Sequence, residues 1–384
     1  MNMPVRQLNL KAITSLRFFA SAAIVIFHMQ GVLIPGWYAP CLALGVSFFF
    51  VLSGFILTYS YSHRFEIRQF YVSRIARLWP VHLTTLLIAI PVADQSGAVP
   101  SLTNALLLQA WIPVVGYVFS LNAVSWSISA EVLFYALFPV LRGRFLEPAI
   151  WITVALTVGI LLGLDLFAKE IWPPVTPPMG QFYSAYVVLQ FPMMRLLEFC
   201  VGMVAGRIFV ARKIGTNTSH ELAVISLAMV FAIFSQPIRT VLSDHGFSHT
   251  GLWVSQSSGA VIFAALIYVF AHERGWISCA LKARPLVFLG EISFSTYMLH
   301  QIVSRYLATY DLNSIPLYLG VTYAGSYLLW MVIEKPGKRG LEKALSRPNH
   351  VGGKASSENS VGIDGFPTLN VQNDRLAHNA TDLN

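Results

Sequence analysis

Long apolar runs dominate the pattern of the chain. A transmembrane helix needs about 20 predominantly apolar residues, and ten runs approach this length. They cover residues 15–34, 42–61, 75–93, 124–141, 148–168, 191–210, 221–239, 253–272, 285–307 and 315–334. The pattern predicts an all-α integral membrane protein, a bundle of about ten transmembrane helices.

The segments between the runs predict how the chain is organised. Residues 102–111 form an apolar run too short to cross, which favours a re-entrant or interfacial segment on the outer side. Residues 171–180 are proline-rich and predict a stiff outer loop. We expect a membrane domain at 1–345, followed by a polar, disordered cytoplasmic tail at 346–384.

The basic residues are distributed unevenly between the two sides. With a cytoplasmic N-terminus, 22 of the 26 lysines and arginines fall in or beside inner segments. Lys169 and Arg239 are the two in outer segments, and Arg195 and Arg305 lie within spans. Positive charge accumulates on the cytoplasmic side of membrane proteins, so this pattern predicts that both termini are cytoplasmic.

Composition narrows the class further. With 55% hydrophobic and 11% charged residues, the chain is far from the balance of a soluble domain. We attribute the net charge of +8 to the inner loops and not to a nucleic-acid partner. The three cysteines are far apart and have no CxxC spacing, which indicates neither a disulfide framework nor a metal site.

Ionisable residues inside the apolar runs are the candidate chemistry, because such groups are costly in a membrane and usually mark a functional site. Arg17 and His28 are eleven residues apart, which returns to nearly the same helix face about 16 Å further along the axis. Arg74 and Arg77 share a face at the inner start of the third run. Arginine binds phosphate bidentately, so this geometry suits a long anionic cofactor that enters from the cytoplasm.

Each of these residues also has a simpler explanation. Arg74 and Arg77 are of the kind that anchors a helix start, and His28 could be satisfied by a neighbouring helix. Glu131 could pair with Arg195 or Arg305 instead of acting in a site.

The remaining intramembrane groups rank lower. We place Glu198 and Glu291 below Glu131. His300 is nine residues from Glu291, on the opposite face of a continuous helix, and is expected to be structural or a minor contributor.

Six segments also form a set. They are RFFASAAIVIFH (17–28), GVSFFFVLSGFIL (45–57), SRIARLWP (73–80), SWSISAEVLFY (125–135), LGEISFSTYMLH (289–300) and EKP (334–336). In order and spacing they resemble the type 3 membrane acyltransferase family. That family includes O-acetyltransferases of bacterial surface polysaccharides and nodulation factors, and enzymes that acylate macrolide sugars.

The resemblance implies transfer of an acyl group, commonly acetyl, from acyl-CoA to a hydroxyl. From the residue pattern, we expect no metal. It implies a catalytic role for His28 with the preceding Arg17, and CoA binding by Arg74 and Arg77. Glu131 lies in a motif flanked by Ala130 and Val132, where many relatives differ, so its role is less defined: it could orient the imidazole or position the acceptor.

The resemblance also bears on partners and location. The expected partners are acyl-CoA, the lipid bilayer and a glycan, glycolipid or sugar-containing acceptor, and the expected location is the bacterial inner membrane. The hydrolase-like domain fused to some relatives has no counterpart here, so we expect the membrane domain and its outer loops to recognise the acceptor.

Two matters stay open at the level of sequence. His28 could act as a general base on the acceptor hydroxyl, or it could be acylated itself. The competing class is a transporter or flippase of a lipid-linked or anionic substrate, in which His28 would carry protons. Transport would need an ion gradient and no acyl-CoA, whereas acyl transfer would release free CoA.

Overall fold

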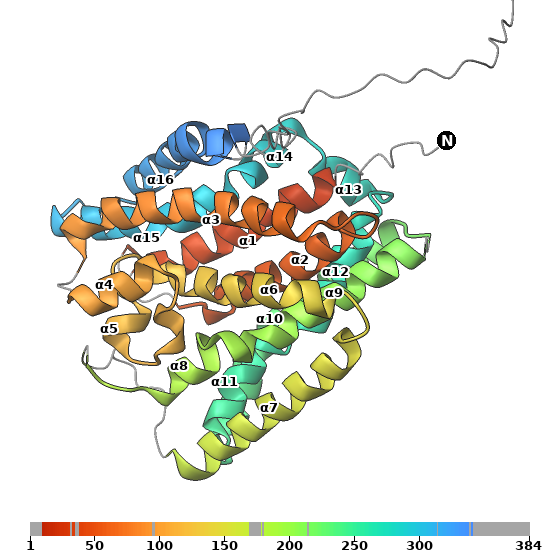
Figure 1. Ribbon diagram of the computed structural model, residues 1–384, viewed down its shortest axis with the longest axis horizontal. Helices are drawn as coiled ribbons and strands as arrows, with labels where there is room; N and C mark the ends of the chain where they lie inside the picture. The colour runs from red at the N-terminus through yellow and green to blue at the C-terminus, as the bar shows by residue number, and fades with distance from the viewer. Residues whose placement is uncertain are drawn as a thin grey trace, which may run out of the picture. The chain divides into compact units, whose positions relative to one another are not determined.

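The computed structural model describes residues 10–30, 33–34, 38–93, 97–168, 178, 180–212, 215–312, 314–337 and 339–340. These residues form helices joined by short segments, with no β-sheet among them (Figure 1). The predicted all-α class is therefore confirmed for this part of the chain. The tail at 346–384 and most of the proline-rich segment at 171–180 lie outside the described residues.

The longer helices follow the predicted apolar runs. They are α1 (Lys11–Met29), α2 (Leu44–Ser60), α3 (Ile67–Ala89), α6 (Trp126–Leu141), α7 (Leu146–Phe167), α9 (Leu196–Ala211), α10 (Thr218–Asp244), α12 (Ala260–Ala271), α15 (Ser293–Thr309) and α16 (Ile315–Leu329). Short helices complete the list: α4 (Ala98–Ala105), α5 (Val115–Val118), α8 (Ser184–Leu189), α11 (Ser248–Ser257), α13 (Trp276–Leu281), α14 (Arg284–Glu291), η1 (Pro40–Ala43), η2 (Ile90–Val92), η3 (Gln109–Trp111), η4 (Ala123–Ser125), η5 (Pro192–Arg195) and η6 (Trp330–Glu334).

Eight stretches within the described ranges are long and apolar enough to cross a membrane, or nine if the bent pair α14 and α15 is one span. The chain is thus a multi-pass membrane protein, but the predicted count of about ten is not confirmed. The predicted run at 191–210 forms η5 and then α9, which has only 16 residues. The run 191–210 begins with polar residues, among them Arg195 and Glu198, which are buried. These residues shorten the apolar stretch that could cross the membrane.

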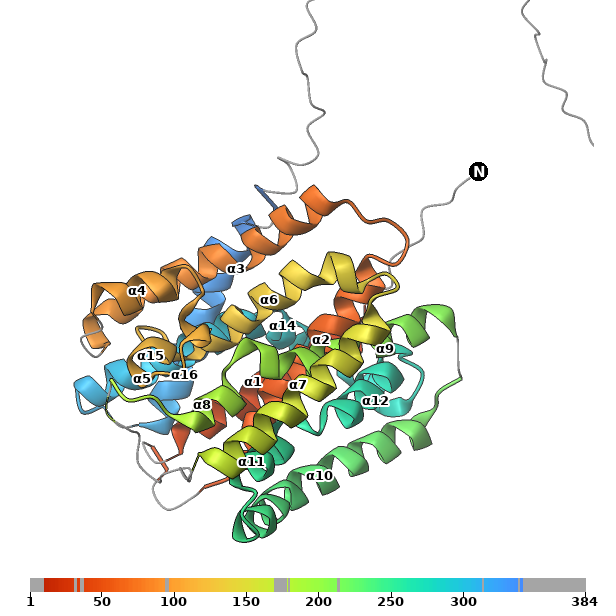
Figure 2. The same ribbon diagram turned by 60° about the horizontal axis from the view of Figure 1, so that its bottom comes forward.

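The helices on the periphery differ from those inside. Few side chains of α7 and α10 are buried although these helices are strongly apolar, as expected of surfaces that face lipid. Figure 1 shows α7 at the lower right of the bundle, and Figure 2 shows α10 along its lower edge. By contrast, α2 and α9 pack closely together in the interior.

Glycines allow the close approach of α2 and α9. A Cβ atom at Gly54 would overlap the Phe199 carbonyl oxygen, and one at Gly202 would overlap the Val51 carbonyl oxygen. Small residues at a helix interface let backbones approach and increase van der Waals contact, the main source of helix association in a membrane. The pair α2–α9 is therefore a fixed element on which α1, α6 and α12 pack.

The predicted run at 285–307 is not one straight helix. Helices α14 and α15 are bent by 62° at Ile292. Gly290 in α14 lies against the Thr14 carbonyl of α1, with no room for a Cβ atom, so α14 follows α1 and the chain turns to enter the bundle. Because Glu291 and His300 belong to different helices, the opposite-face argument for His300 does not apply.

The predicted short segment at 102–111 folds as the end of α4 followed by η3 and does not form a long helix. Buried polar side chains hold it: Asn104 donates to the Ser120 hydroxyl at 3.0 Å, and Gln109 donates to Ser125 at the same distance. The His82 ring nitrogen of α3 lies 2.9 Å from the Asn104 carbonyl oxygen. These contacts attach the segment to α3 and to the residues from Ser120 to η4.

We expect Gly202→Val to destabilise the protein by about 1–3 kcal/mol, because the added side chain would have to displace the α2 backbone. The measurement is the thermal midpoint of detergent-solubilised protein. Gly159→Val is the matched control, since no atom lies within 4 Å of a Cβ at Gly159 on α7. Equal midpoints for the two variants would contradict the proposed role of the α2–α9 contact.

Candidate active site

A cavity of about 410 Å³, here called the arginine cavity, lies between α1, α2, α3 and α6. Three of the basic residues singled out by the sequence line it: Arg17 from α1, and Arg74 and Arg77 from α3. Glu131 of α6 lines it too, together with Ser53, Tyr59 and Ser60 of α2. The fold thus gathers four of the five predicted site residues around one space.

The charges in and around this cavity act on one another. Arg17 is repelled by Arg77 and attracted by Glu131 and Glu334. The Tyr135 hydroxyl donates to Glu131 at 3.0 Å. Three arginines therefore face two carboxylates, which leaves an excess of positive charge for an anionic ligand.

Glu334 is a member of this group to which the sequence analysis assigned no role, although it begins the EKP segment. It ends η6, a π-helical segment, and is 2% exposed. Its carboxylate accepts a hydrogen bond from Ser295 at 2.8 Å. In the sequence, the signal for Glu334 was a carboxylate at the end of an apolar run. In the structure, its place in a π-helical segment is a second signal, because such segments are frequent at functional sites.

His28 lies elsewhere, in a cavity of about 240 Å³ that we call the histidine cavity. Its polar lining includes Gln190, Arg195, Arg239 and Gln256, and its aromatic lining comprises Phe27, Tyr38, Phe119, Trp126 and Tyr297. The sequence analysis assigned none of these residues to a site and named Arg195 only as a possible structural partner of Glu131. Apart from Phe27, which adjoins His28 on α1, they come from segments that no spacing rule connects to His28.

A narrow third cavity of about 50 Å³ lies between the two. It shares Arg17, Arg77 and Glu131 with the arginine cavity, and Val46 and Tyr297 with the histidine cavity. The three spaces therefore adjoin in series, from the arginines to His28. This is the axis that the spacing of Arg17 and His28 on α1 predicts.

His300 is the hydrogen-bonding partner of His28. Its Nε2 atom lies 3.0 Å from Nδ1 of His28, which is also 3.0 Å from the Ile24 carbonyl oxygen. Nδ1 of His300 lies 2.7 Å from the Tyr297 carbonyl oxygen.

These contacts determine the tautomers of the neutral pair. A carbonyl oxygen only accepts, so Nδ1 of His300 carries a hydrogen and its Nε2 is the acceptor. Nδ1 of His28 then donates to His300, and Nε2 of His28 keeps the lone pair. A basic nitrogen is thereby available in the histidine cavity.

The other carboxylates and arginines are placed as follows. Glu131 is hydrogen-bonded by Tyr135 and lies with the arginines, not with the His28 ring. Arg195 pairs with Glu198 at 3.3 Å, and Arg305 donates to the Leu121 carbonyl at 2.6 Å. Glu291 is exposed at the end of α14. By geometry, His300 and not Glu131 orients the His28 imidazole.

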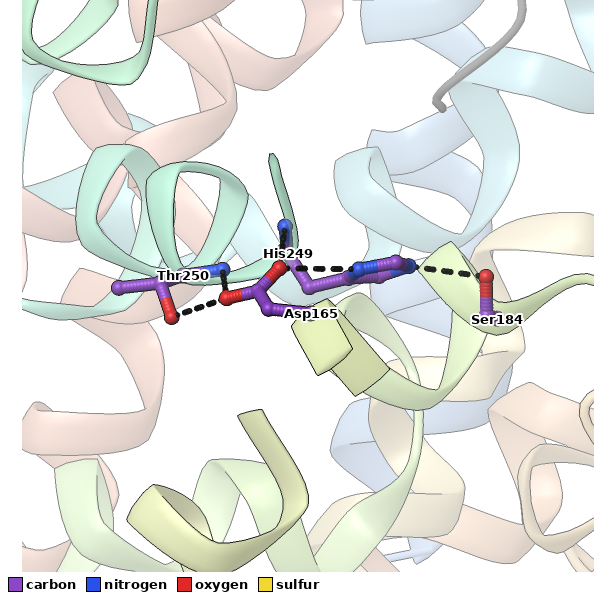
Figure 3. Close-up of polar contacts among 4 residues, drawn as sticks. All are labelled: Asp165, Ser184, His249 and Thr250. Carbon is purple, nitrogen blue, oxygen red and sulfur yellow. Dashed lines mark hydrogen bonds and ion pairs between the residues drawn. The ribbon is translucent and has the colours of Figure 1, made fainter. Parts of the chain in front are cut away.

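A second polar cluster has the residue types of a catalytic triad (Figure 3). A His249 ring nitrogen, Nε2, lies 2.9 Å from the Ser184 hydroxyl, and its Nδ1 lies 3.1 Å from Asp165. However, Asp165 also accepts from the backbone N–H groups of His249 and Thr250 and from the Thr250 hydroxyl.

This cluster is structural. Ser184 and His249 are 1% and 3% exposed and line none of the three cavities described above. A carboxylate that accepts the first N–H groups of α11 acts as a helix cap. The cluster ties α7, α8 and α11 together beside the histidine cavity, to which α8 and α11 contribute Leu189, Leu252 and Gln256.

Within the described ranges, no group of three or more histidine, cysteine, aspartate or glutamate side chains is arranged to hold a metal ion. The histidine pair supplies a basic nitrogen, and the arginine cavity supplies a cationic surface.

One helical membrane bundle thus contains a cationic cavity and a partly buried histidine, and the comparison with known proteins decides its class. Residues 10–334 match the model of the acyltransferase-domain family, and the chain belongs to that family. It is an O-acetyltransferase-like enzyme.

Two relatives illustrate the family. The chain is 27% identical over 330 residues to acyltransferase MdmB of Streptomyces mycarofaciens, covering 79% of this chain and 81% of that protein. It is 24% identical over 338 residues to O-acetyltransferase OatA of Staphylococcus aureus, covering 81% of this chain but only 53% of that longer protein. No solved structure matches the chain significantly.

We expect His300→Ala to lower the turnover of acyl transfer on the order of 10²-fold, since a misoriented catalytic group costs about that much. His300→Gln should retain more activity, because its amide oxygen can accept from Nδ1 of His28. The measurement is kcat and KM for the acyl donor, with the loss expected in kcat. Equal losses in both variants, or no loss in either, would contradict the orienting role.

We expect Ser184→Ala to keep the wild-type turnover per folded molecule, and Asp165→Ala to lower the thermal midpoint. The reason is that the cluster caps α11 and performs no chemistry. Both variants are compared by acyl transfer and by thermal unfolding. A loss of turnover in Ser184→Ala with an unchanged midpoint would instead identify Ser184 as a nucleophile.

Proposed function

We propose that the protein transfers an acetyl group from acetyl-CoA to a hydroxyl of a sugar or glycan, in the inner membrane of a bacterium and with both termini in the cytoplasm. The observation that carries the proposal is the series of three adjoining cavities from the arginines to His28. Acetyl as the transferred group rests on the name of one relative, an O-acetyltransferase.

The arginine cavity suits the nucleotide end of acyl-CoA. Arg74 and Arg77 approach it from one helix and Arg17 from another, and a guanidinium binds phosphate through two parallel hydrogen bonds. The negative charges of Glu131 and Glu334 balance part of this positive charge. In this proposal the pantetheine arm then passes Glu131 and Tyr297 through the narrow cavity.

His28 acts as a general base in the proposed reaction. Its Nε2 takes the proton from the acceptor hydroxyl while that oxygen attacks the thioester carbonyl. The new C–O bond forms, the C–S bond breaks, and the proton passes from His28 to the thiolate, so that an ester and free CoA leave. His300 keeps Nδ1 of His28 occupied as a donor throughout.

The transporter alternative uses the same buried charges but has no support from the family match. Acyl transfer consumes the thioester and needs no ion gradient. Free CoA released by purified protein therefore distinguishes the two classes.

We expect Arg74→Ala to raise the apparent KM for acetyl-CoA about tenfold or more, because a charge-assisted hydrogen bond contributes about 1.5–3 kcal/mol. The matched control is Arg142→Ala: Arg142 follows α6, stacks at 4.3 Å on the Phe65 ring and does not line the cavity. Initial rates over a range of acetyl-CoA concentrations give the measurement. An unchanged KM in Arg74→Ala would exclude this arginine from donor binding.

We expect His28→Ala to abolish turnover while CoA binding persists, since His28 lies in a different cavity from the arginines. Bacteria with the intact protein, without it, or with His28→Ala are compared by mass spectrometry of surface glycans, glycolipids and secreted glycosides. An acetyl-sized mass increase only with the intact protein is the expected result. CoA binding lost in His28→Ala, with turnover retained, would reverse the assigned roles.

A further inference from the structure

Two residues line both the narrow cavity and the histidine cavity: Val46 of α2 and Tyr297 of α15. They are only 9% and 7% exposed, so both belong to the packed interior. The narrow cavity itself measures about 50 Å³. A group that moves from the arginines to His28 therefore passes these two residues at the tightest part of the route.

The Tyr297 ring is held at its hydroxyl end. The hydroxyl donates to the Val124 carbonyl oxygen at 3.0 Å, and the Ser127 hydroxyl, 2.7 Å away, then donates to it. Ser127 lines the narrow cavity and Val124 lines the histidine cavity. Rotation of the ring would leave buried polar groups unpaired, which is costly, so the ring is a fixed wall.

Ring contacts place the Tyr297 side chain between the two spaces. Its centre lies 6.4 Å from the ring centre of Phe49, which lines both the arginine cavity and the narrow cavity. On the other side, it lies 5.8 Å from the ring centre of His300, the partner of His28. The phenol ring thus borders the step from one space to the next.

The opposite wall belongs to α2. Val46, Phe49 and Phe50 are spaced i, i+3 and i+4, so they share one helix face, and all three line the narrow cavity. A Cβ atom at Gly45 would overlap the Ala20 carbonyl oxygen of α1. Because α2 touches the α1 backbone beside Val46, this wall is also held in place.

A constriction with fixed walls discriminates by width more than by length. With the nucleotide end at the arginines, the acyl group of the donor enters the constriction first. A straight acyl chain is no wider than the pantetheine arm behind it. A branch on the carbon next to the carbonyl adds a second methyl group at the same level, and closely packed walls leave no room for it.

We propose that Val46 and Tyr297 form a width filter, which admits straight-chain acyl groups to His28 and excludes donors branched next to the carbonyl. This inference rests on the proposed function for the donor, acyl-CoA, and for its entry from the arginine cavity. The filter itself rests on the two residues that line both spaces.

A pair of isomeric thioethers tests the filter without turnover. S-n-butyl-CoA and S-isobutyl-CoA have a methylene in place of the thioester carbonyl, so neither can transfer an acyl group. They contain the same atoms and differ only in the branch. Isothermal titration calorimetry on the full chain in detergent gives the affinity for each, with free CoA as the reference.

S-n-butyl-CoA should bind at least about tenfold more tightly than S-isobutyl-CoA, because one methyl group in a close-fitting apolar site changes affinity roughly 10- to 200-fold. S-isobutyl-CoA should bind like free CoA, since only its nucleotide end is accommodated. Equal affinities for the two isomers would overturn the proposal.

Substitutions at Val46 should change the preference in opposite directions. Val46→Ala should raise the affinity for S-isobutyl-CoA about tenfold, because it widens the constriction. Val46→Ile should lower the affinity for S-n-butyl-CoA to that of free CoA. General destabilisation does not produce both effects, and a preference that Val46→Ala leaves unchanged would overturn the proposal.

Val51→Ala is the matched control. Val51 lies on the same helix and is 0% exposed, but it lines none of the three cavities. This variant should keep the wild-type preference between the isomers. A loss of preference equal to that of Val46→Ala would show that the effect does not come from the constriction, and would overturn the proposal.

Tyr297→Phe tests the second wall. It keeps the ring but removes the hydroxyl that holds it against Val124 and Ser127, so the preference for S-n-butyl-CoA should fall. A preference equal to that of the wild type would remove Tyr297 from the filter.

Release of free CoA from acetyl-CoA is measured in membranes of the producing bacterium, with and without the protein, where the acceptor is present. Release together with equal binding of the two isomers would overturn the filter and leave acyl transfer. A clear isomer preference without release would overturn acyl transfer and leave a passage selective for unbranched CoA thioethers.

Discussion

The cost of charge in a membrane shapes the whole interior of this protein. An ionisable side chain that cannot reach water must find a partner or a polar cavity within the bundle. Arg17, Arg74 and Arg77 surround one cavity with Glu131, and Arg195 pairs with Glu198 beside another. The helices are therefore arranged around two polar spaces, while apolar faces such as those of α7 and α10 turn outward.

That arrangement separates two tasks in space. Three arginines line the arginine cavity, whereas the histidine cavity combines a histidine pair, amides and aromatic rings with Arg239 and with Arg195, whose charge Glu198 balances. A cavity of only about 50 Å³ joins them. In the proposed reaction, an anionic donor is held at one end, a basic nitrogen is presented at the other, and the narrow passage limits what reaches His28 from the arginine cavity.

Close helix packing makes this geometry possible. Gly54 and Gly202 bring α2 and α9 together, and Gly290 turns the chain from α14 into α15. The bend directs α15 so that His300 reaches His28. One hydrogen bond between residues 272 positions apart then selects the tautomer of the candidate catalytic base.

The sequence by itself determined the helical membrane class, the family, and the common axis of Arg17 and His28, because apolar length and helical period are local properties. It also marked Arg74, Arg77 and Glu131, since charge in an apolar run is visible in one segment. Only the tertiary structure decided that His300 contacts His28, that Glu334 joins the arginines, and that Val46 and Tyr297 line the same two cavities. These are contacts between helices distant in the chain, and they depend on the 62° bend and on close glycine packing, neither of which the period of one helix records.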